Sequence, residues 1–290
     1  MASEPTGPKS GTPKSGTSGL TPKQQAEQAR AEAEASERRR ERMIRIVGGL
    51  AVLLVVGGLL AVGFFAGQDK DSGTSVTAPP TADPDAASPK GVSSDTYGVK
   101  YGTGWTSADE AKLPTLEMWE DFQCPACKAL EEAAGADIMA LADAGKVKLL
   151  YRPTTFLDNS LASANQAAGN PNSSARATSA WGCAVDAGRT GPYHSTIFAN
   201  QPSQEGDGYS DQQLIEFGTA AGVPEAETDA FTKCVQDGTY LAWSANSYQA
   251  FLEAGISGTP SANLNGVEIS NSDLADIAIL TQKIEAATAK

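Results

Sequence analysis

The sequence LEMWEDFQCPAC, residues 116–127, decides the fold of this chain. Its apolar and aromatic first part predicts a strand over residues 113–122, and residues 124–144 predict a helix. A C-x-x-C placed where a helix follows a strand is typical of redox chemistry, because the helix N-terminus favours a thiolate on the first cysteine. Pro125 suits the first turn of that helix, where its missing N–H costs no hydrogen bond.

Strands and helices are also predicted on both sides of this segment. Residues 146–152 predict a second strand, which completes a βαβ unit with a parallel pair. Near the C-terminus, Asn265-Gly266 separates two short strands and is a strong hairpin signal. A closing helix is predicted over residues 272–286. The region between these parts contains helical candidates only: residues 175–187, 193–198, 211–221, 225–237 and 240–254. The sequence therefore predicts an α/β domain with an all-helical insertion over about residues 160–254.

The N-terminal part contains a membrane-spanning pattern. Residues 46–67 are 22 apolar or glycine residues without a charge, enough for one transmembrane helix in a lipid bilayer. The five arginines between positions 38 and 45 place the N-terminus in the cytoplasm. A buried core helix is the alternative, but the stretch has no polar face. We predict four parts: a disordered to helical cytoplasmic segment (1–43), a transmembrane helix (44–67), a flexible extracytoplasmic tether (68–95) and a folded domain (96–290).

Charge and cysteines divide at the same place. Residues 1–66 carry a net charge of +3 and residues 67–290 carry −16. An exported part this acidic is not expected to bind nucleic acid. All four cysteines lie on the exported side, where disulfides persist. Their two spacings suggest one catalytic pair, Cys124 with Cys127, and one structural pair, Cys183 with Cys234. A second redox pair or two free buried thiols is the alternative for Cys183 and Cys234.

The order of the motifs resembles the DsbA-like thiol–disulfide oxidoreductases, in which a thioredoxin fold carries an inserted helical domain. The resemblance covers about residues 96–290. It rests on residues 120–127 (EDFQCPAC), residues 193–202 (YHSTIFANQP) and residues 255–260 (GISGTP) in the family's order. Membrane-anchored members of the actinobacterial type look similar overall, including the tether.

The resemblance implies a role for each residue of the site. Cys124 is the expected nucleophile, and Cys127 is expected to be more buried and to re-form the internal disulfide. Pro260 is expected to follow a cis peptide bond, and the backbone of Thr259 to pair with an extended substrate. A static structural disulfide at the C-x-x-C is the alternative.

Two positions depart from the family pattern. Pro125 and Ala126 form the dipeptide that tunes the reduction potential, and Ala126 stands where relatives often have a histidine that favours the thiolate. Many relatives also carry a buried acid six residues before the first cysteine, at the position of Met118 here. Glu117, Glu120 and Asp121 are the candidates to replace it as a proton carrier.

No metal and no other cofactor is predicted. Half of a zinc site would need further ligands, and the chain has a single histidine, His194. We interpret His194 as a structural residue of the insertion, because a packed histidine beside aromatic residues is commoner than a general base.

These observations support a membrane-tethered, extracytoplasmic oxidoreductase that forms disulfides in exported cysteine-containing proteins. The resemblance implies a quinone-linked membrane oxidase as its recharging partner. A reductase or isomerase of the same fold is one alternative. A non-catalytic tethered chaperone or binding module is another.

Overall fold

The structure is a computed structural model that describes residues 78–93 and 95–288. The cytoplasmic segment and the transmembrane helix predicted over residues 1–67 lie outside these described residues. Within the described ranges, no helix has the length and apolar character needed to cross a membrane.

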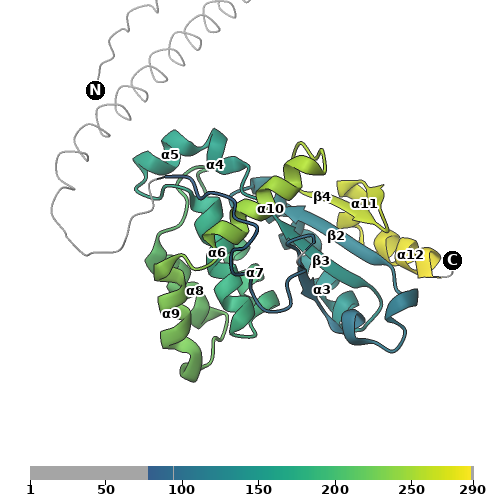
Figure 1. Cartoon of the computed structure of the whole chain (residues 1–290). Helices are drawn as coiled ribbons and strands as arrows, with labels where there is room; N and C mark the ends of the chain where they lie inside the picture. Colours follow the sequence, from purple (N-terminus) through teal and green to yellow (C-terminus); the bar gives the residue numbers. More distant parts are fainter. Residues whose placement is uncertain (1–77, 94, 289–290) are drawn as a thin grey trace, which may run out of the picture. The chain divides into compact units, whose positions relative to one another are not determined.

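A five-stranded mixed sheet forms the centre of the domain (Figure 1). The predicted parallel pair, β2 with β3, lies in its middle. β1 pairs antiparallel with β3 on one side, and β4 and β5 continue antiparallel from β2 on the other. The strand bounds are β1 Val99–Tyr101, β2 Thr115–Glu120, β3 Lys148–Pro153, β4 Ser261–Leu264 and β5 Val267–Ile269.

The β4–β5 turn has the backbone that its sequence predicts. Asn265 has φ 51° and Gly266 has φ 78°. Two successive positive φ angles are what a tight two-residue hairpin needs, and Asn-Gly adopts them at the lowest cost. The turn thereby brings β5 back antiparallel beside β4, at the edge of the sheet.

The helix that carries the C-x-x-C is interrupted once. It begins as α2 (Pro125–Leu130), passes through a π-helical turn, η3 (Glu131–Gly135), and continues as α3 (Ala136–Asp143). The predicted closing helix is also divided, into α11 (Asn271–Ala275) and α12 (Ile277–Thr288), because Asp276 between them is extended.

The two faces of β2 serve different layers. Successive side chains of a strand point to opposite faces. Trp119 lies on one face and meets Phe251 of α10 (Leu241–Glu253) edge-to-face, with ring centroids 5.6 Å apart. Met118 and Glu120 lie on the other face, and Glu120 lies close to residues of η3 and α7 (Thr190–Ala199) there. The alternation therefore places Glu120 on the face of the sheet that the C-x-x-C helix covers.

The insertion is helical, as predicted, and all five predicted helices are present. α4 and α5 precede them and were not predicted. The α8 helix begins with a full capping box between Ser210 and Gln213. The helices are α4 Leu157–Ser160, α5 Ala162–Ala167, α6 Ser173–Asp186, α7 Thr190–Ala199, α8 Asp211–Ala220, α9 Thr228–Asp237 and α10 Leu241–Glu253. Short 3-10 turns occur at η1 Thr103–Thr106, η2 Glu110–Lys112 and η4 Glu225–Glu227.

The tether prediction is wrong for residues 78–93, which run along the insertion (dark blue in Figure 1). The Asp83 N–H donates to Asn246 Oδ1 over 2.8 Å, and the Lys90 N–H donates to Asp186 Oδ1 over 2.7 Å. The segment is poor in large apolar residues, so its composition suggested a free spacer. Polar side chains of the insertion instead satisfy its backbone, which composition alone does not show.

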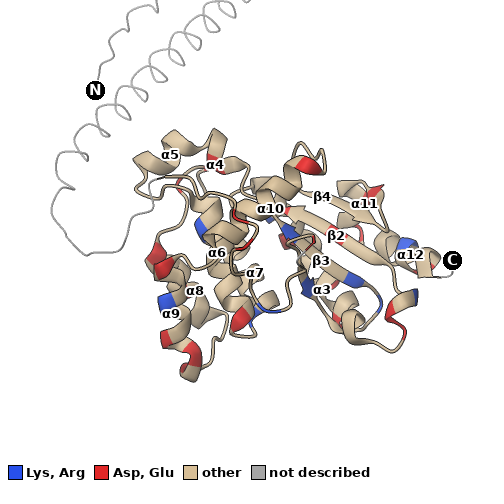
Figure 2. Ribbon diagram, in the orientation of Figure 1, with Lys and Arg blue, Asp and Glu red and all other residues tan. Residues whose placement is uncertain are grey.

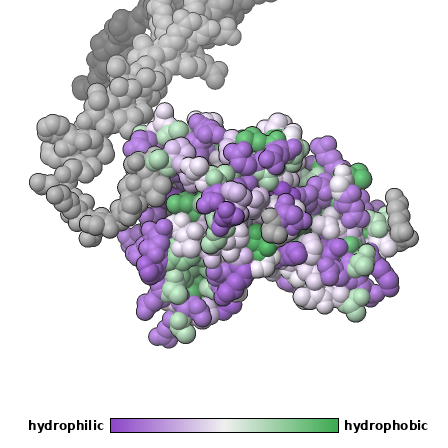
Figure 3. All heavy atoms as spheres, in the orientation of Figure 1, coloured by the Kyte–Doolittle hydropathy of each residue, from purple (hydrophilic) through white to green (hydrophobic). Residues whose placement is uncertain are grey.

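The surface of the described domain is polar. Figure 2 shows acidic residues on the helices of the insertion as well as near the sheet. On the face drawn in Figure 3, hydrophobic residues form small, separate patches among hydrophilic ones. Among the described residues, the exposed large hydrophobic side chains are Leu252, Val267 and Ile279.

Candidate active site

The first cysteine lies at the start of α2, where its sequence context predicts it. Cys124 is the N-cap residue, with an extended backbone (φ −75°, ψ 118°), and Pro125 is the first helical residue. Cys124 is 7 % exposed, whereas Cys127, one turn into the helix, is fully buried. Both are free thiols in this structure. The helix start therefore holds the two sulfur atoms in unlike surroundings.

These surroundings move the two thiol pKa values in opposite directions. The hydrogen bond from Cys127 is the main cause that lowers the pKa of Cys124 to about 6, with help from Thr259 and the backbone N–H groups of Cys127 and Ala126. Burial is the main cause that raises the pKa of Cys127 well above its ordinary value. At neutral pH Cys124 is a thiolate and Cys127 a thiol.

The Gly-Thr-Pro segment lies against the first cysteine. The Thr259–Pro260 peptide bond is cis. The carbonyl oxygen of Thr259 lies 3.4 Å from Cys124 Sγ. Residues 135 positions apart in the sequence thus meet at one site.

The turn before Cys124 is held by the insertion. Gln201 Nε2 donates to the carbonyl oxygens of Phe122 (2.8 Å) and Cys124 (3.0 Å). The Tyr209 hydroxyl donates to the same Phe122 oxygen over 2.7 Å. Gln201 is the penultimate residue of the YHSTIFANQP segment, and its role was not predicted from the sequence. These bonds fix the backbone on which Cys124 sits.

Asp121 belongs to a buried polar network between the sheet and the insertion. Its Oδ1 accepts bonds from the Ser174 hydroxyl (2.6 Å) and the Gln123 N–H (2.9 Å), and its Oδ2 accepts from the Leu157 N–H (3.1 Å). Burial is the main cause that raises the pKa of Asp121 to about 8. Both oxygens of Asp121 are thus engaged, in contacts with α6, with α4 and with the turn before Cys124.

Glu117 lies on the opposite face of β2 from Met118 and is paired there. It forms an ion pair with Arg152 and accepts a bond from Asn263 Nδ2 over 2.8 Å. Arg152 in turn lies over the ring of Trp119, 3.9 Å from its centroid. Of the three acids named from the sequence, two therefore have other structural roles.

Glu120 is the acid that the structure couples to the thiols. It lies two residues after Met118 on the same strand face, so it takes the side on which the family's acid is expected. Burial, followed by the charge of Cys124, raises the pKa of Glu120 to about 8. The charge of Glu120 in turn contributes to the raised pKa of Cys127.

Two further titratable residues accompany Glu120. His194 Nε2 lies 3.1 Å from Glu120 Oε2, and Glu131 Oε2 lies 3.7 Å from His194 Nδ1. Glu131 was not singled out from the sequence. Its position four residues after Cys127 was the available signal, because that spacing places both on one side of a helix.

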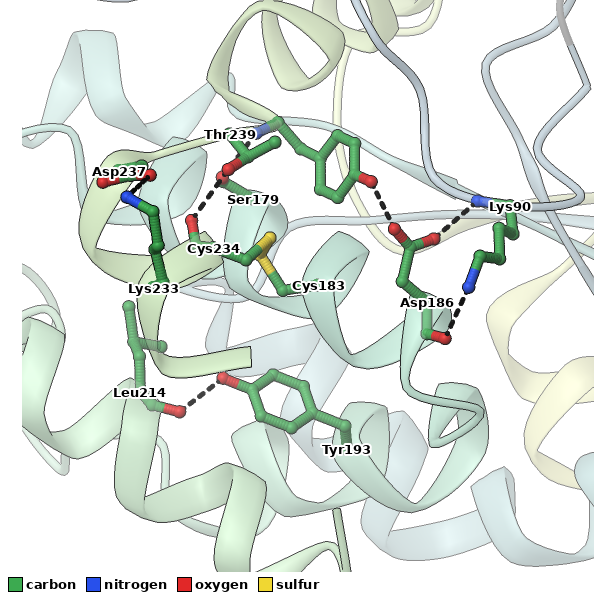
Figure 4. The surroundings of a disulfide bond; sticks show 11 residues. Lys90, Ser179, Cys183, Asp186, Tyr193, Leu214, Lys233, Cys234, Asp237 and Thr239 are labelled. Carbon is green, nitrogen blue, oxygen red and sulfur yellow. Dashed lines mark hydrogen bonds and ion pairs between the residues drawn. A yellow bond between two sulfur atoms is a disulfide. The ribbon is translucent and has the colours of Figure 1, made fainter. Parts of the chain in front are cut away.

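The second cysteine pair joins two helices of the insertion (Figure 4). Cys183 of α6 and Cys234 of α9 form a disulfide, with Cα atoms 5.9 Å apart. Beside it, Asp186 accepts hydrogen bonds from Tyr240 and from the Lys90 N–H. The pair thus lies among structural contacts and on helices other than the one that carries Cys124.

Comparisons with known proteins agree with this geometry. The family model described as thioredoxin matches residues 103–280. The structure of MdbA, a thiol–disulfide oxidoreductase from Actinomyces oris, is similar with a TM-score of 0.53 at 20% identity, over 68% of this chain and 88% of that one. Oxidised BdbD from Bacillus subtilis has a TM-score of 0.53 at 17% identity, over 73% of this chain and 100% of that one.

A third structure, MdbA of Corynebacterium matruchotii, has a TM-score of 0.52 at 21% identity, over 72% of this chain and 96% of that one. At such identities these likenesses concern the fold. A search of curated protein sequences finds no match. The match to the family model spans more than half of the chain. The chain therefore belongs to the thioredoxin family and has the DsbA-like form of its fold.

Proposed function

We propose that this protein is a thiol–disulfide oxidoreductase that forms disulfides in exported proteins through Cys124 and Cys127. The observation that carries the proposal is the unlike state of the two thiols. The pKa of Cys124 is lowered to about 6 at the start of α2, and the pKa of the buried Cys127 is raised. A dithiol of this kind opens and closes a disulfide through one reactive sulfur.

The reaction begins from the Cys124–Cys127 disulfide. A substrate thiolate forms a bond to Cys124 Sγ, and the internal bond breaks with its electron pair going to Cys127 Sγ. A second substrate thiolate then attacks the substrate sulfur of the mixed disulfide, and Cys124 leaves as a thiolate. The substrate loses two electrons and the protein gains them. Glu120 serves as the proton carrier for Cys127, because its charge raises the pKa of Cys127 and the charge of Cys124 raises its own.

Extended cysteine-containing segments are the proposed substrates. The Thr259 backbone, beside Cys124 and just before β4, offers an edge to such a segment. Pro125 and Ala126 are exposed at the helix start. Ala126 contributes to the low pKa of Cys124 through its N–H and brings no side-chain charge.

The low pKa of Cys124 supports net oxidation of substrates. A low pKa at Cys124 stabilises the dithiol form, and a stabilised dithiol makes the disulfide form oxidising. We therefore propose net oxidation of substrates, with recharging by a quinone-linked membrane oxidase. We also propose that residues 44–67 anchor the protein in the cell membrane, with its N-terminus cytoplasmic and the catalytic domain outside.

The first experiment is equilibration of the full chain, in a mild detergent, against glutathione at fixed pH. The state of each cysteine pair is read separately by mass spectrometry. A reduction potential near or above about −180 mV supports disulfide donation or isomerisation, whereas one near about −270 mV means that the protein reduces exported disulfides.

A Cys124→Ser variant separates catalysis from binding. We expect it to lose dithiol oxidation while the Cys183–Cys234 disulfide stays intact. A tethered chaperone or binding module would keep its activity in cells without Cys124, and that result would overturn the proposal.

A further inference from the structure

A buried group of three titratable side chains accompanies the thiols. Glu120 of β2, Glu131 of η3 and His194 of α7 each offer one atom within 4.8 Å of the others. Their side chains are 5 %, 5 % and 2 % exposed, respectively. Glu120 Oε1, Glu131 Oε1 and His194 Nδ1 have no hydrogen-bond partner. Unsatisfied atoms gathered in one buried place indicate that protons, or a cation, lie between them.

The donor set favours protons. A closed zinc site uses four ligands, and a catalytic one keeps water in the fourth position. Three donor residues form the group among the described residues. The rings of Tyr151, Trp181 and Phe198 lie around His194, with centroids 4.3, 5.2 and 5.1 Å away. Aromatic rings thus surround His194, and the buried Tyr151 hydroxyl among them also has no hydrogen-bond partner.

The Glu131 carboxyl can reach this group because Gly135, one turn later in the helix, has no side chain. A Cβ at Gly135 would lie 2.1 Å from Glu131 Oε2, so the carboxyl occupies the space that any other residue would fill. Both residues belong to the π-helical turn, a feature that occurs frequently at functional sites. Gly135 and the π-helical turn together place the Glu131 carboxyl beside Glu120.

We propose that Glu131, seated by Gly135, is a positioning residue that stabilises the charge left on Glu120 when Glu120 gives its proton to Cys127. The two carboxyl groups offer oxygens within 4.8 Å of each other, and the protonated Glu131 carboxyl, as a donor toward Glu120, lowers the pKa of Glu120. We assign the His194 Nε2–H as the second donor, 3.1 Å from Glu120 Oε2. The inference rests on the proposed function, which produces the Cys127 thiolate.

The proton transfer is balanced in both directions. When a substrate thiolate bonds to Cys124, the electron pair of the broken disulfide goes to Cys127 Sγ. The Glu120 carboxyl gives its proton to that sulfur and becomes a carboxylate. During recharging, Cys124 is joined to the membrane partner in a mixed disulfide. The Cys127 thiol returns its proton to Glu120, and the Cys127 sulfur attacks Cys124 Sγ. The bond to the partner breaks, and the partner's sulfur leaves with its electron pair.

The order of the pKa values supports this direction. Burial is the main cause that raises the pKa of Glu120 and of Glu131 to about 8, so both carry protons at neutral pH. Burial raises the pKa of Cys127 well above its ordinary value, so a thiolate there takes a proton from a carboxyl.

The other titratable groups that face Glu120 and Glu131 do not compete for the proton that passes between Glu120 and Cys127. Burial lowers the pKa of His194, which keeps its ring neutral and able to donate from one nitrogen. Tyr151 of β3 has a pKa raised by burial and stays protonated. Cys124 of α2 adds a negative charge in the reduced protein, which raises the pKa of Glu120.

The test is the pH dependence of disulfide opening in the full chain. The rate of opening by dithiothreitol is divided by the concentration of dithiothreitol thiolate at each pH, and the thiols formed are trapped by alkylation. The corrected rate should fall as Glu120 loses its proton, and Glu120→Gln should abolish this fall. Glu131→Met removes the donor, so the fall should move upward by about one pH unit or more.

Conservative and neighbouring variants serve as controls. Glu131→Gln keeps a donating N–H and should restore the wild-type pH of the fall. Glu132 is the next residue, and its side chain is 63 % exposed. Glu132→Gln should therefore leave the pH of the fall unchanged. Gly135→Ala should displace the Glu131 carboxyl and shift the fall upward, as Glu131→Met does. In a Glu131→Met background, Gly135→Ala should add no further shift.

The outcomes separate this inference from the proposed function. If the wild-type disulfide does not exchange, the proposed function fails. If it exchanges but a folded Glu131→Met or Gly135→Ala variant keeps the wild-type pH of the fall, Glu131 has only a structural role and the inference is wrong. A stoichiometric metal ion in the purified chain, measured by plasma mass spectrometry, would also overturn it.

Discussion

At the scale of single residues, the two active-site cysteines differ through their surroundings. Cys124 receives hydrogen bonds at a helix start, and burial is the main cause that raises the pKa of Cys127. We predict that iodoacetamide alkylates Cys124 in the reduced full chain with a half-maximal rate near pH 6. Cys127 should react far more slowly throughout. Peptide mass spectrometry across a pH series measures both. Equal profiles centred near about pH 8.5, the value of a free thiol, would contradict the assigned asymmetry.

Ala126 offers a second prediction at this scale. Its side chain is exposed and contributes no charge, while its N–H helps to lower the pKa of Cys124. An Ala126→His variant adds an imidazolium close to the thiolate, which should lower that pKa further. The equilibrium with glutathione should shift about 10-fold toward the dithiol form, the equivalent of one pKa unit. Ala129→His, also exposed on α2, is the matched control and should shift it much less.

At the scale of elements, the contact between the insertion and the turn before α2 is the testable feature. Gln201 is buried, and its amide satisfies the carbonyl oxygens of Phe122 and Cys124. Gln201→Ala leaves the Cys124 oxygen without this partner, which should cost about 1–3 kcal/mol of unfolding free energy. Urea unfolding measures the loss. The exposed neighbour Gln204 is the control, and Gln204→Ala should change stability by less than about 0.5 kcal/mol. Equal effects of the two variants would show that the contact is not a stabilising one.

The elements were predictable wherever a local pattern specifies them. The C-x-x-C helix, the parallel strands and the Asn265-Gly266 hairpin follow from periodicity, a helix start and a turn dipeptide. The π turn does not follow from such patterns, because it depends on how Glu131 packs beside Gly135. β1 has only three residues, too few to show a period.

The candidate site was predictable only in part, for a related reason. The cysteines and the Thr259–Pro260 segment belong to sequence motifs. Glu120 was one of three possible acids, and the alternation of β2 together with the pairing of Glu117 singles it out. Gln201 reaches the site from the insertion, which requires tertiary structure to see. Glu131 follows Cys127 by one helical turn, but that spacing does not show that its carboxyl lies beside Glu120.

At the scale of the whole molecule, the disulfide joins Cys183 of one helix to Cys234 of another, 51 residues later in the chain. Closing a loop of this length restricts the unfolded chain by roughly 4 kcal/mol in the chain-entropy relation. A Cys183→Ala, Cys234→Ala variant should therefore lose stability of that order in guanidinium unfolding. A Cys124→Ser, Cys127→Ser variant is the control, because its pair closes a very short loop and should change stability much less. A loss no larger than in the control would show that the disulfide does not stabilise the fold.

The placement of the catalytic domain outside the cell is the last prediction at this scale. Residues 46–67 are preceded by five arginines and followed by Gln68, Asp69, Lys70 and Asp71. Positive charge beside a membrane span stays in the cytoplasm. Alkaline phosphatase fused after Lys290 should therefore be active, since this enzyme works only outside the cytoplasm.

Replacing the five arginines by glutamine, with lysine at positions 68, 69 and 71, should abolish the phosphatase activity by inverting the span. Acidic residues contribute little to orientation, so Glu37→Gln with Glu41→Gln should leave it unchanged. Inactive phosphatase on the unaltered chain would place the domain in the cytoplasm, where a disulfide donor has no substrates to oxidise.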